Sequence, residues 1–204
     1  MKEDNLFIVF EGIDGSGKSS LAKMLADRLT SDGKKVFLTM EPTSNEAGNL
    51  IRKFLSGELG ECIDESTKSD VLSLLFAADR KLHIEEIKSK LNDGYYVICD
   101  RYLYSSLAYQ KDMEFTQICN RDYLPADYVV YIESDINKCL ERINKNRGHK
   151  EIFEKKKELE RIKYNYDRKI IPYIPDVKVQ KINGDNSLSE MFTDLMTSEL
   201  GKLL

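Results

Sequence analysis

The chain has 204 residues, of which 41% are hydrophobic and 32% are charged, and its formal net charge is −4. This length suffices for one well-buried domain and is short for two. The acidic balance argues against a general nucleic-acid-binding protein, because such proteins need surplus lysine and arginine to neutralise phosphates. No stretch approaches the roughly 18 apolar residues of a membrane span, and the apolar run near the start is too short for a signal peptide. We therefore expect one soluble domain over residues 1–204, with neither nucleic acid nor a membrane as its partner.

Short apolar runs alternate with helical patterns along the chain. Five runs, at residues 6–10, 36–40, 95–99, 128–132 and 177–182, predict β-strands because each is brief and rich in β-branched or aromatic residues. A helix is predicted over residues 18–30, where Leu21, Leu25 and Leu29 share one face, and a longer helix over residues 66–91. Apolar strands that alternate with helices indicate a parallel sheet covered on both faces. The predicted fold class is α/β.

The four cysteines, Cys62, Cys99, Cys119 and Cys139, lack the spacing of metal ligands and the density of a secreted disulfide scaffold. We expect them to be reduced core residues. Reduced cysteines are typical of a cytoplasmic protein.

The sequence FEGIDGSGKSS lies between the first predicted strand and the first predicted helix. Gly12, Gly17, Lys18 and Ser19 complete the pattern G-x-x-x-x-G-K-[ST], in which backbone N–H groups surround phosphates, the lysine reaches the transferring oxygens and the hydroxyl meets Mg²⁺. A structural glycine turn with a surface lysine is the alternative, but the flanking strand and helix favour a nucleoside triphosphate site. The loop alone does not distinguish a kinase from a GTPase or an ATPase, although no N-K-x-D reader of guanine follows. Asp14 adds a carboxylate beside the phosphates, which suggests the hydroxyl of a second ligand.

A second polar group occurs in VICDRYLYSSLAYQ, after the third predicted strand. Asp100 ends this strand, where its carboxylate could help hold hydrated Mg²⁺, and Arg101 is a candidate phosphate clamp. A pair that caps the next helix is the alternative. Upstream, Phe76 and Arg80 lie four residues apart on one helix face, where they could stack on a base and bind its edge. Core packing beside a surface arginine is the alternative for these two.

Four segments together resemble the thymidylate kinases: EGIDGSGKSS, LLFAADR, DRYLYSSLAYQ and LPADYVVYIESD occur in the order and spacing of that family. The third segment is the most specific, whereas many unrelated NTPases share the first. The resemblance runs from about residue 6 to the C-terminus. It implies a P-loop NTPase fold with a five-stranded parallel sheet flanked by helices, a helical lid at about residues 143–157, and a homodimer. It also implies that ATP and dTMP react to give ADP and dTDP, with Mg²⁺.

The resemblance further implies roles for single residues. It implies an ATP site at Gly12, Ile13, Asp14, Gly15, Ser16, Gly17, Lys18, Ser19 and Arg142, the last of these nearer the adenine. It implies a dTMP site at Asp14, Glu41, Phe76, Arg80, Arg101, Ser106, Tyr109 and Gln110. In this site Asp14 would bind the sugar 3′-hydroxyl, Phe76 would stack on thymine, and Tyr109 would disfavour a ribose 2′-hydroxyl. Ser19 and Asp100 would lie at the metal.

The chain departs from the family pattern at two places. Many bacterial members read R-E-P-G-G-T after the second strand, but this chain reads MEPTSNEAG. Arg52, on the following helix, is therefore our candidate for holding the acceptor phosphate, with an exposed helix residue as the alternative. The phosphate loop also lacks the arginine that some members carry, so catalytic charge would come from Lys18, Arg101 and the lid residues Arg147 and Lys150. A solvated helix pair is the alternative for the charge-dense residues 143–161.

Two rival functions stay open. A deoxynucleoside kinase phosphorylates a neutral 5′-hydroxyl and needs a carboxylate base, which Glu41 could supply at the end of the second strand. A P-loop ATPase that acts as an assembly switch would bind ATP through the same loop. It would not need Phe76, Arg80 and Tyr109 arranged as a base and sugar pocket. The response of turnover to acceptor nucleotides separates these functions.

Overall fold

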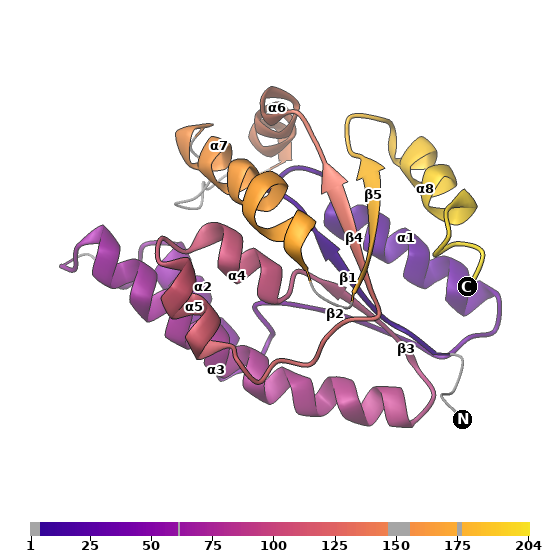
Figure 1. Cartoon of the computed structure of the whole chain (residues 1–204), viewed down its shortest axis with the longest axis horizontal. Coiled ribbons are helices and arrows are strands. Elements are labelled where there is room, and N and C mark those ends of the chain that lie inside the picture. Colours follow the sequence, from indigo (N-terminus) through magenta and orange to yellow (C-terminus); the bar gives the residue numbers. More distant parts are fainter. Residues whose placement is uncertain (1–4, 61, 147–155, 175–176) are drawn as a thin grey trace.

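A five-stranded parallel sheet forms the centre of the molecule in the computed structural model, which describes residues 5–60, 62–146, 156–174 and 177–204 (Figure 1). The strands are β1 (Phe7–Glu11), β2 (Val36–Met40), β3 (Tyr96–Asp100), β4 (Tyr128–Glu133) and β5 (Lys178–Asn183). Their order in the sheet is β2-β3-β1-β4-β5, and every neighbouring pair is parallel. This arrangement confirms the predicted α/β class. Each observed strand begins within one residue of the start of its predicted run.

Helices cover both faces of this sheet (Figure 1). They are α1 (Lys18–Ser31), α2 (Glu46–Leu55), α3 (Glu65–Asn92), α4 (Leu103–Tyr109), α5 (Met113–Cys119), α6 (Ile136–Asn146), α7 (Lys156–Asn165) and α8 (Leu188–Thr197). A π-helix (Tyr166–Ile170) and a short 3₁₀ turn (Ile171–Tyr173) continue α7. Among the described helices, none has the length and apolar character to cross a membrane.

The alternation of side chains along the strands divides the core into two layers. Ile8 and Phe10 of β1 pack with α1 and α8, whereas Phe7 and Val9 of the same strand pack in the cluster that contains residues of α3, α4, α6 and α7. The predicted apolar face of α1 is part of the first layer, with Leu21, Leu25 and Leu29 fully buried. Burial of each such leucine stabilises the fold by about 1.5–3 kcal/mol.

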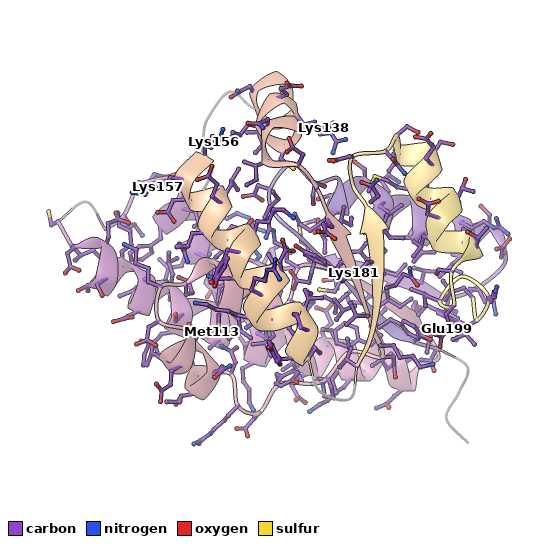
Figure 2. The ribbon with its side chains drawn as sticks, turned by 45° about the horizontal axis from the view of Figure 1, so that its top comes forward. Met113, Lys138, Lys156, Lys157, Lys181 and Glu199 are labelled. Carbon is purple, nitrogen blue, oxygen red and sulfur yellow. The ribbon has the colours of Figure 1, made fainter. Side chains whose placement is uncertain are left out.

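The helices beside the predicted lid have both a solvated and a buried face. Lys138 of α6 and the first two residues of α7, Lys156 and Lys157, are exposed on the surface (Figure 2). Leu159 and Ile162 of α7 are instead fully buried in the core. The helix pair predicted from composition therefore carries an apolar side that its charge density concealed.

One prediction about the core is wrong. Cys99 and Cys139 are buried free thiols, but Cys62 is exposed and Cys119 is half-buried. Cys62 lies in the connection between α2 and α3, outside the strands and helices. The cysteines as a group are therefore not core residues.

The carboxyl ends of four strands meet at one edge of the sheet. Phe10 of β1 is in register with Asp100 of β3 and Val130 of β4, and Met40 of β2 is in register with Asp100. The loops that follow these strands therefore open side by side. In open α/β sheets, ligands bind at this edge.

Candidate active site

The loop after β1 packs so closely against β4 and α6 that two of its positions require glycine. A Cβ atom on Gly12 would lie 2.7 Å from the carbonyl oxygen of Ile132, and one on Gly15 would lie 2.5 Å from that of Cys139. Both glycines have positive φ, at 146° and 79°. Helix α1 begins directly after Gly17, which offers no side-chain cap to the first turn. The amide groups of that turn are thus oriented toward an anion.

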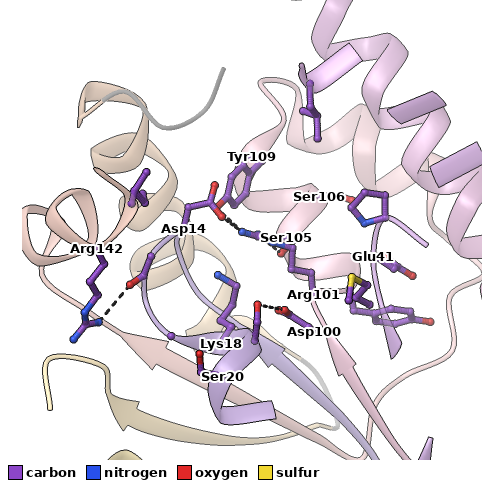
Figure 3. A pocket seen from close by; sticks show the side chains of 18 of the residues that line it. Asp14, Lys18, Ser20, Glu41, Asp100, Arg101, Ser105, Ser106, Tyr109 and Arg142 are labelled. Carbon is purple, nitrogen blue, oxygen red and sulfur yellow. Dashed lines mark hydrogen bonds and ion pairs between the residues drawn. The ribbon is translucent and has the colours of Figure 1, made fainter. Parts of the chain in front are cut away.

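Lys18 is almost entirely buried at the start of α1, and its Nζ donates a hydrogen bond of 2.8 Å to the carbonyl oxygen of Ile13. Burial and the positive charge of Arg101 lower the pKa of Lys18 to about 8, although Asp14 and Asp100 act in the opposite direction. A buried ammonium of this kind is stabilised by an anionic ligand. The amine points into the space between Asp14 and Asp100 (Figure 3).

Ser19 and Asp100 form a candidate site for a hydrated cation. The Ser19 hydroxyl donates a hydrogen bond to Oδ2 of Asp100. The other oxygen, Oδ1, is buried and has no hydrogen-bond partner among the described residues. Those residues contain no cluster of three or more His, Cys, Asp or Glu side chains that could hold a metal ion unaided. One carboxylate and one hydroxyl fit Mg²⁺, which is commonly bound through one or two carboxylates together with substrate phosphates.

Arg101 joins the phosphate loop to α4. Its guanidinium forms an ion pair with Asp14, lies 4.9 Å from the ring centroid of Tyr109, and donates a 3.1 Å hydrogen bond to Ser105 (Figure 3). Arg101 is the one non-glycine residue in the described segments with a positive φ, at 69°. Such a conformation in a side-chain-bearing residue persists where surrounding contacts impose it, and it is common at functional sites.

Arg80 of α3 is buried in a network with Glu41, and the sequence-based alternative of a surface arginine is wrong. Only 1% of Arg80 is exposed. Its Nε and Nη2 donate to Oε2 of Glu41 at 2.9 and 2.5 Å, its Nη2 donates to Ser106 at 3.0 Å, and its Nη1 donates to Asn120 at 2.5 Å. The other Glu41 oxygen lies 3.1 Å from Nδ1 of His83. Among the described residues, four of the five guanidinium N–H groups thus have partners, and one N–H group of Nη1 has none.

Phe76 lies on the same face of α3 as Arg80, and both line the cavity at the end of the sheet. Phe76 also packs against the small cluster of Ile51, Leu55 and Leu72. The aromatic ring therefore combines core packing with exposure to the cavity. Its predicted role as a stacking platform stays a prediction.

Gln110 ends α4 with an unused donor. Its Oε1 accepts a long hydrogen bond of 3.4 Å from Ser69, whereas its Nε2 is buried and has no hydrogen-bond partner among the described residues.

Arg52 of α2 is exposed. Its Nη1 donates to the carbonyl oxygen of Thr43 and its Nη2 to that of Pro42, both at 2.6 Å. Arg52 thus supports the loop after β2 while it lines the cavity.

One cavity of about 570 Å³ joins these groups. The predicted residues that line it are Asp14, Gly15, Gly17, Lys18, Ser19, Glu41, Arg52, Phe76, Arg80, Asp100, Arg101, Ser106, Tyr109, Gln110 and Arg142. Gly12, Ile13 and Ser16 belong to the buried part of the phosphate loop behind it. Arg142 of α6 donates at 2.8 Å to the carbonyl oxygen of Gly184 and at 3.3 Å to that of Gly15. Arg147 and Lys150 lie outside the described residues, as does most of the predicted lid.

Sequence reasoning missed several supporting residues. Asp79 is fully buried and accepts hydrogen bonds from the backbone N–H and the hydroxyl of Thr43, which fixes the loop after β2 against α3. His83 and Asn120 hold the Glu41 and Arg80 side chains. Asp79 and His83 are polar residues one turn apart within the helix predicted over residues 66–91, and that spacing is a signal that could have found them. Asn120 follows α5, where the sequence predicted no helix.

Comparisons with known proteins agree on one family. A family model described as thymidylate kinase matches residues 10–190. A protein of Methanococcus aeolicus named "Probable thymidylate kinase" is 46% identical over 79% of this chain and 78% of its own length. Relatives of the same name from Thermococcus gammatolerans and Pyrococcus horikoshii are 40% and 38% identical, covering 94% and 97% of both chains. The solved thymidylate kinase of Candida albicans has a TM-score of 0.71 and 23% identity over 94% of this chain and 89% of its own, a likeness of fold.

Proposed function

The chain belongs to the thymidylate kinase family, and we propose that the cavity at the edge of its sheet is where it phosphorylates dTMP to dTDP with the γ-phosphoryl group of ATP. This assignment rests on one observation: a phosphate-binding loop and a candidate nucleoside-binding group line the same cavity. The phosphate loop with Lys18 lines one side, and Phe76, Arg80 and Tyr109 line the other. A phosphate-binding loop alone serves many NTPases, but the second half-site suits a nucleoside monophosphate.

ATP occupies the side of the cavity formed by the phosphate loop and the start of α8. The loop amides and the amide groups at the start of α1 surround the donor phosphates, with Lys18 at the transferring oxygens. Arg142 and the residues Asn186 to Leu188 line the same side and form the adenine end. The hydrogen bonds from Arg142 to Gly15 and Gly184 support this assignment, because they hold the adenine-side loop against the phosphate loop.

Ser19 and Asp100 would hold Mg²⁺ at the donor phosphates. The chemistry that the ion would supply when bound is neutralisation of phosphate charge. Oδ1 of Asp100 supports this assignment, because it is buried without a hydrogen-bond partner among the described residues, in a side chain that lines the cavity. Ser19 contributes its hydroxyl beside the carboxylate.

The acceptor dTMP occupies the side formed by α3 and α4. Phe76 stacks on the thymine ring, and the remaining N–H group of Arg80 binds a carbonyl oxygen at the edge of the base. Gln110 and Ser106 lie near the base, and Gln110 Nε2 supplies a further donor. Asp14 binds the 3′-hydroxyl of the sugar, Tyr109 excludes a 2′-hydroxyl, and Arg52 holds the acceptor phosphate.

Phosphoryl transfer in this site needs alignment and charge neutralisation rather than a general base. The attacking atom is an oxygen of the dTMP phosphate, which is already anionic, so no proton must be removed. Lys18 and Arg101 face the same part of the cavity and neutralise the transferring group. Arg147 and Lys150 of the lid complete this charge.

The buried environment of Glu41 disfavours the rival nucleoside kinase. Both carboxylate oxygens are engaged, one by Arg80 and the other by His83, so that neither is poised to accept a proton from a 5′-hydroxyl. Glu41 instead orients the arginine that reads the base. A switch ATPase gains no support from the structure beyond the phosphate loop itself.

The assignment is tested by coupled ADP release with Mg-ATP against dTMP, dUMP, dCMP, UMP and thymidine. The largest kcat/KM with dTMP is expected. A larger kcat/KM with thymidine would indicate that the protein is a nucleoside kinase in which Glu41 acts as the base. No response of ADP release to any of the five acceptors would leave ATP binding as the one supported function.

We also propose that the chain is a cytoplasmic homodimer that binds no nucleic acid. Leu74 and Leu82, eight residues apart on one face of α3, are 53% and 62% exposed, and Ile118 of the adjacent α5 is 59% exposed. Leu72, in the same apolar segment, is buried in the core. We propose that these exposed apolar side chains on neighbouring helices form the subunit contact. Sedimentation should give a dimer that Leu82→Glu converts to a monomer; an unchanged mass would contradict this interface.

A further inference from the structure

Glu11, the last residue of β1, is fully buried and has no part in the chemistry described above. Its Oε1 accepts hydrogen bonds from the backbone N–H groups of Tyr102 at 2.9 Å and Ser105 at 3.1 Å. Its Oε2 accepts hydrogen bonds from the hydroxyls of Ser105 at 2.6 Å and Tyr166 at 2.7 Å. Four donors around one buried carboxylate make a fully satisfied polar cluster, which holds its members in a fixed geometry.

The two backbone groups that Glu11 binds belong to the turn that contains Arg101. Tyr102 follows Arg101 directly, and Ser105 lies within the first turn of α4. On the other side of Arg101, its own backbone N–H donates to the carbonyl oxygen of Phe10, the residue before Glu11. The left-handed backbone at Arg101 is thus held by β1 from both sides. Ser105 also accepts a hydrogen bond from the Arg101 guanidinium, which links Glu11 to that side chain.

Tyr166 brings a third segment to this cluster. It begins the π-helix after α7, and its ring is fully buried beside Tyr131, with 5.4 Å between the ring centroids. Two residues of α7, Arg161 and Asn165, donate to the carbonyl oxygens of Tyr109 at 2.6 Å and Ala108 at 3.0 Å, at the end of α4. The segment that carries the Tyr166 hydroxyl is therefore anchored to both ends of α4. Short π-helical segments of this kind are frequent at functional sites.

We propose that Glu11 is a positioning residue: with the hydroxyls of Ser105 and Tyr166, its carboxylate holds the Arg101 turn in the conformation that directs the guanidinium at the transferring phosphoryl group. This inference rests on the proposed function of Arg101. Glu11 touches no substrate and acts only through the turn. Burial raises the pKa of Glu11 above its usual value, and the hydrogen bonds from Ser105 and Tyr166 and the charge of Arg101 offset this rise in part.

Two substitutions perturb the cluster with little change in side-chain volume. Glu11→Gln keeps the shape of the side chain but replaces one acceptor by an amide donor, and Tyr166→Phe removes a single hydroxyl. The matched control is Tyr131→Phe, because the Tyr131 hydroxyl donates at 2.7 Å to Asp167 in the same π-helix but has no bond to Glu11. All three variants are compared at saturating ATP and dTMP, with KM measured for each substrate.

Glu11→Gln is expected to lower kcat by at least about tenfold and Tyr166→Phe by a few-fold, with Tyr131→Phe within about twofold of the wild type. The decisive measurement is a double-mutant cycle with Arg101→Ala. Once Arg101 is absent, Glu11→Gln should change kcat by less than about twofold. Independent losses that multiply in the double variant would overturn the proposal, as would a wild-type kcat in Glu11→Gln.

Amide exchange followed by NMR makes the inference testable apart from the catalytic assay. The N–H groups of Tyr102 and Ser105 should exchange slowly in the wild type and in Tyr131→Phe, and faster in Glu11→Gln. A wild-type protein that does not phosphorylate dTMP would refute the proposed function, but amide exchange would still test whether Glu11 holds the Arg101 turn. Unchanged exchange in Glu11→Gln would refute the positioning role of Glu11 even in an active enzyme.

Discussion

Arg101 and Asp14 form an ion pair across the cavity, between the turn after β3 and the phosphate loop. Only 19% of the Arg101 side chain and 8% of the Asp14 side chain are exposed, so solvent screens this pair weakly. The pair keeps the guanidinium near Lys18, so that two cations lie close together at the proposed site of the donor phosphates. The site is thus prepared for several negative charges before a nucleotide binds.

Arg101→Ala should lower kcat by more than about tenfold, which corresponds to more than about 1.4 kcal/mol of barrier. The loss is expected in kcat because the guanidinium is proposed to neutralise charge that develops during transfer. Arg28→Ala is the control, since Arg28 is an exposed residue of α1 that pairs with Asp32. A loss below tenfold would remove Arg101 from the catalytic group.

Phe76→Ala should raise the KM for dTMP several-fold and leave the KM for ATP nearly unchanged. Stacking of a base on an aromatic ring contributes about 1–3 kcal/mol by alanine substitution, and the phosphate loop does not depend on this ring. Phe37→Ala is a suitable comparison, because Phe37 is a half-buried residue of β2 that does not line the cavity. Equal increases for both substrates in Phe76→Ala would assign Phe76 to the core alone.

The elements were predictable from sequence because their apolar patterns are local. The long helix predicted over residues 66–91 is observed as Glu65–Asn92, and the strand that ends at Asp100 carries its carboxylate to the phosphate loop. Motif spacing and strand ends pointed to Lys18, Ser19, Asp100 and Arg101 by themselves. Most of the other cavity residues were predictable only because the chain resembles the thymidylate kinases.

The supporting bonds were not predictable in the same way. Glu11 and Tyr166 are 155 residues apart, and nothing in the sequence near either one indicates their hydrogen bond. The same holds for Arg80 and Asn120, and for Asp79 and Thr43, whose contacts depend on how α3 packs against its neighbours. Partner choice among buried polar groups is a tertiary property, which local pattern does not encode.

Asp100→Asn should raise the Mg²⁺ concentration needed for half-maximal activity by about tenfold, because the amide removes one anionic ligand from the proposed cation site. The KM for dTMP should change little, since Asp100 belongs to the proposed donor side of the cavity. Activity is measured over a Mg²⁺ titration at fixed ATP. Asp27→Asn serves as the control, because Asp27 is exposed on α1 beside Lys23. An unchanged Mg²⁺ requirement in Asp100→Asn would exclude this carboxylate from the site.

The lowered pKa of Lys18 predicts that the protein takes up protons when it binds ATP. Its pKa in the free protein is lowered to about 8 by burial, so about half of the molecules hold a neutral amine at pH 8. Phosphates favour the charged form and raise this pKa, so binding at pH 8 should take up about half a proton, falling to about a tenth at pH 7. ATP affinity should correspondingly weaken as the pH rises above 8.

Calorimetry of Mg-ATP binding in two buffers with different ionisation enthalpies measures this uptake directly. Lys18→Arg is the matched variant, because a guanidinium stays charged throughout this pH range and has no proton to gain. Proton uptake at pH 8 should therefore disappear in Lys18→Arg, even though its ATP affinity is expected to be lower. Equal proton uptake in both proteins would show that another group titrates on binding. Lys18 would then not be the cause of the pH dependence of ATP binding.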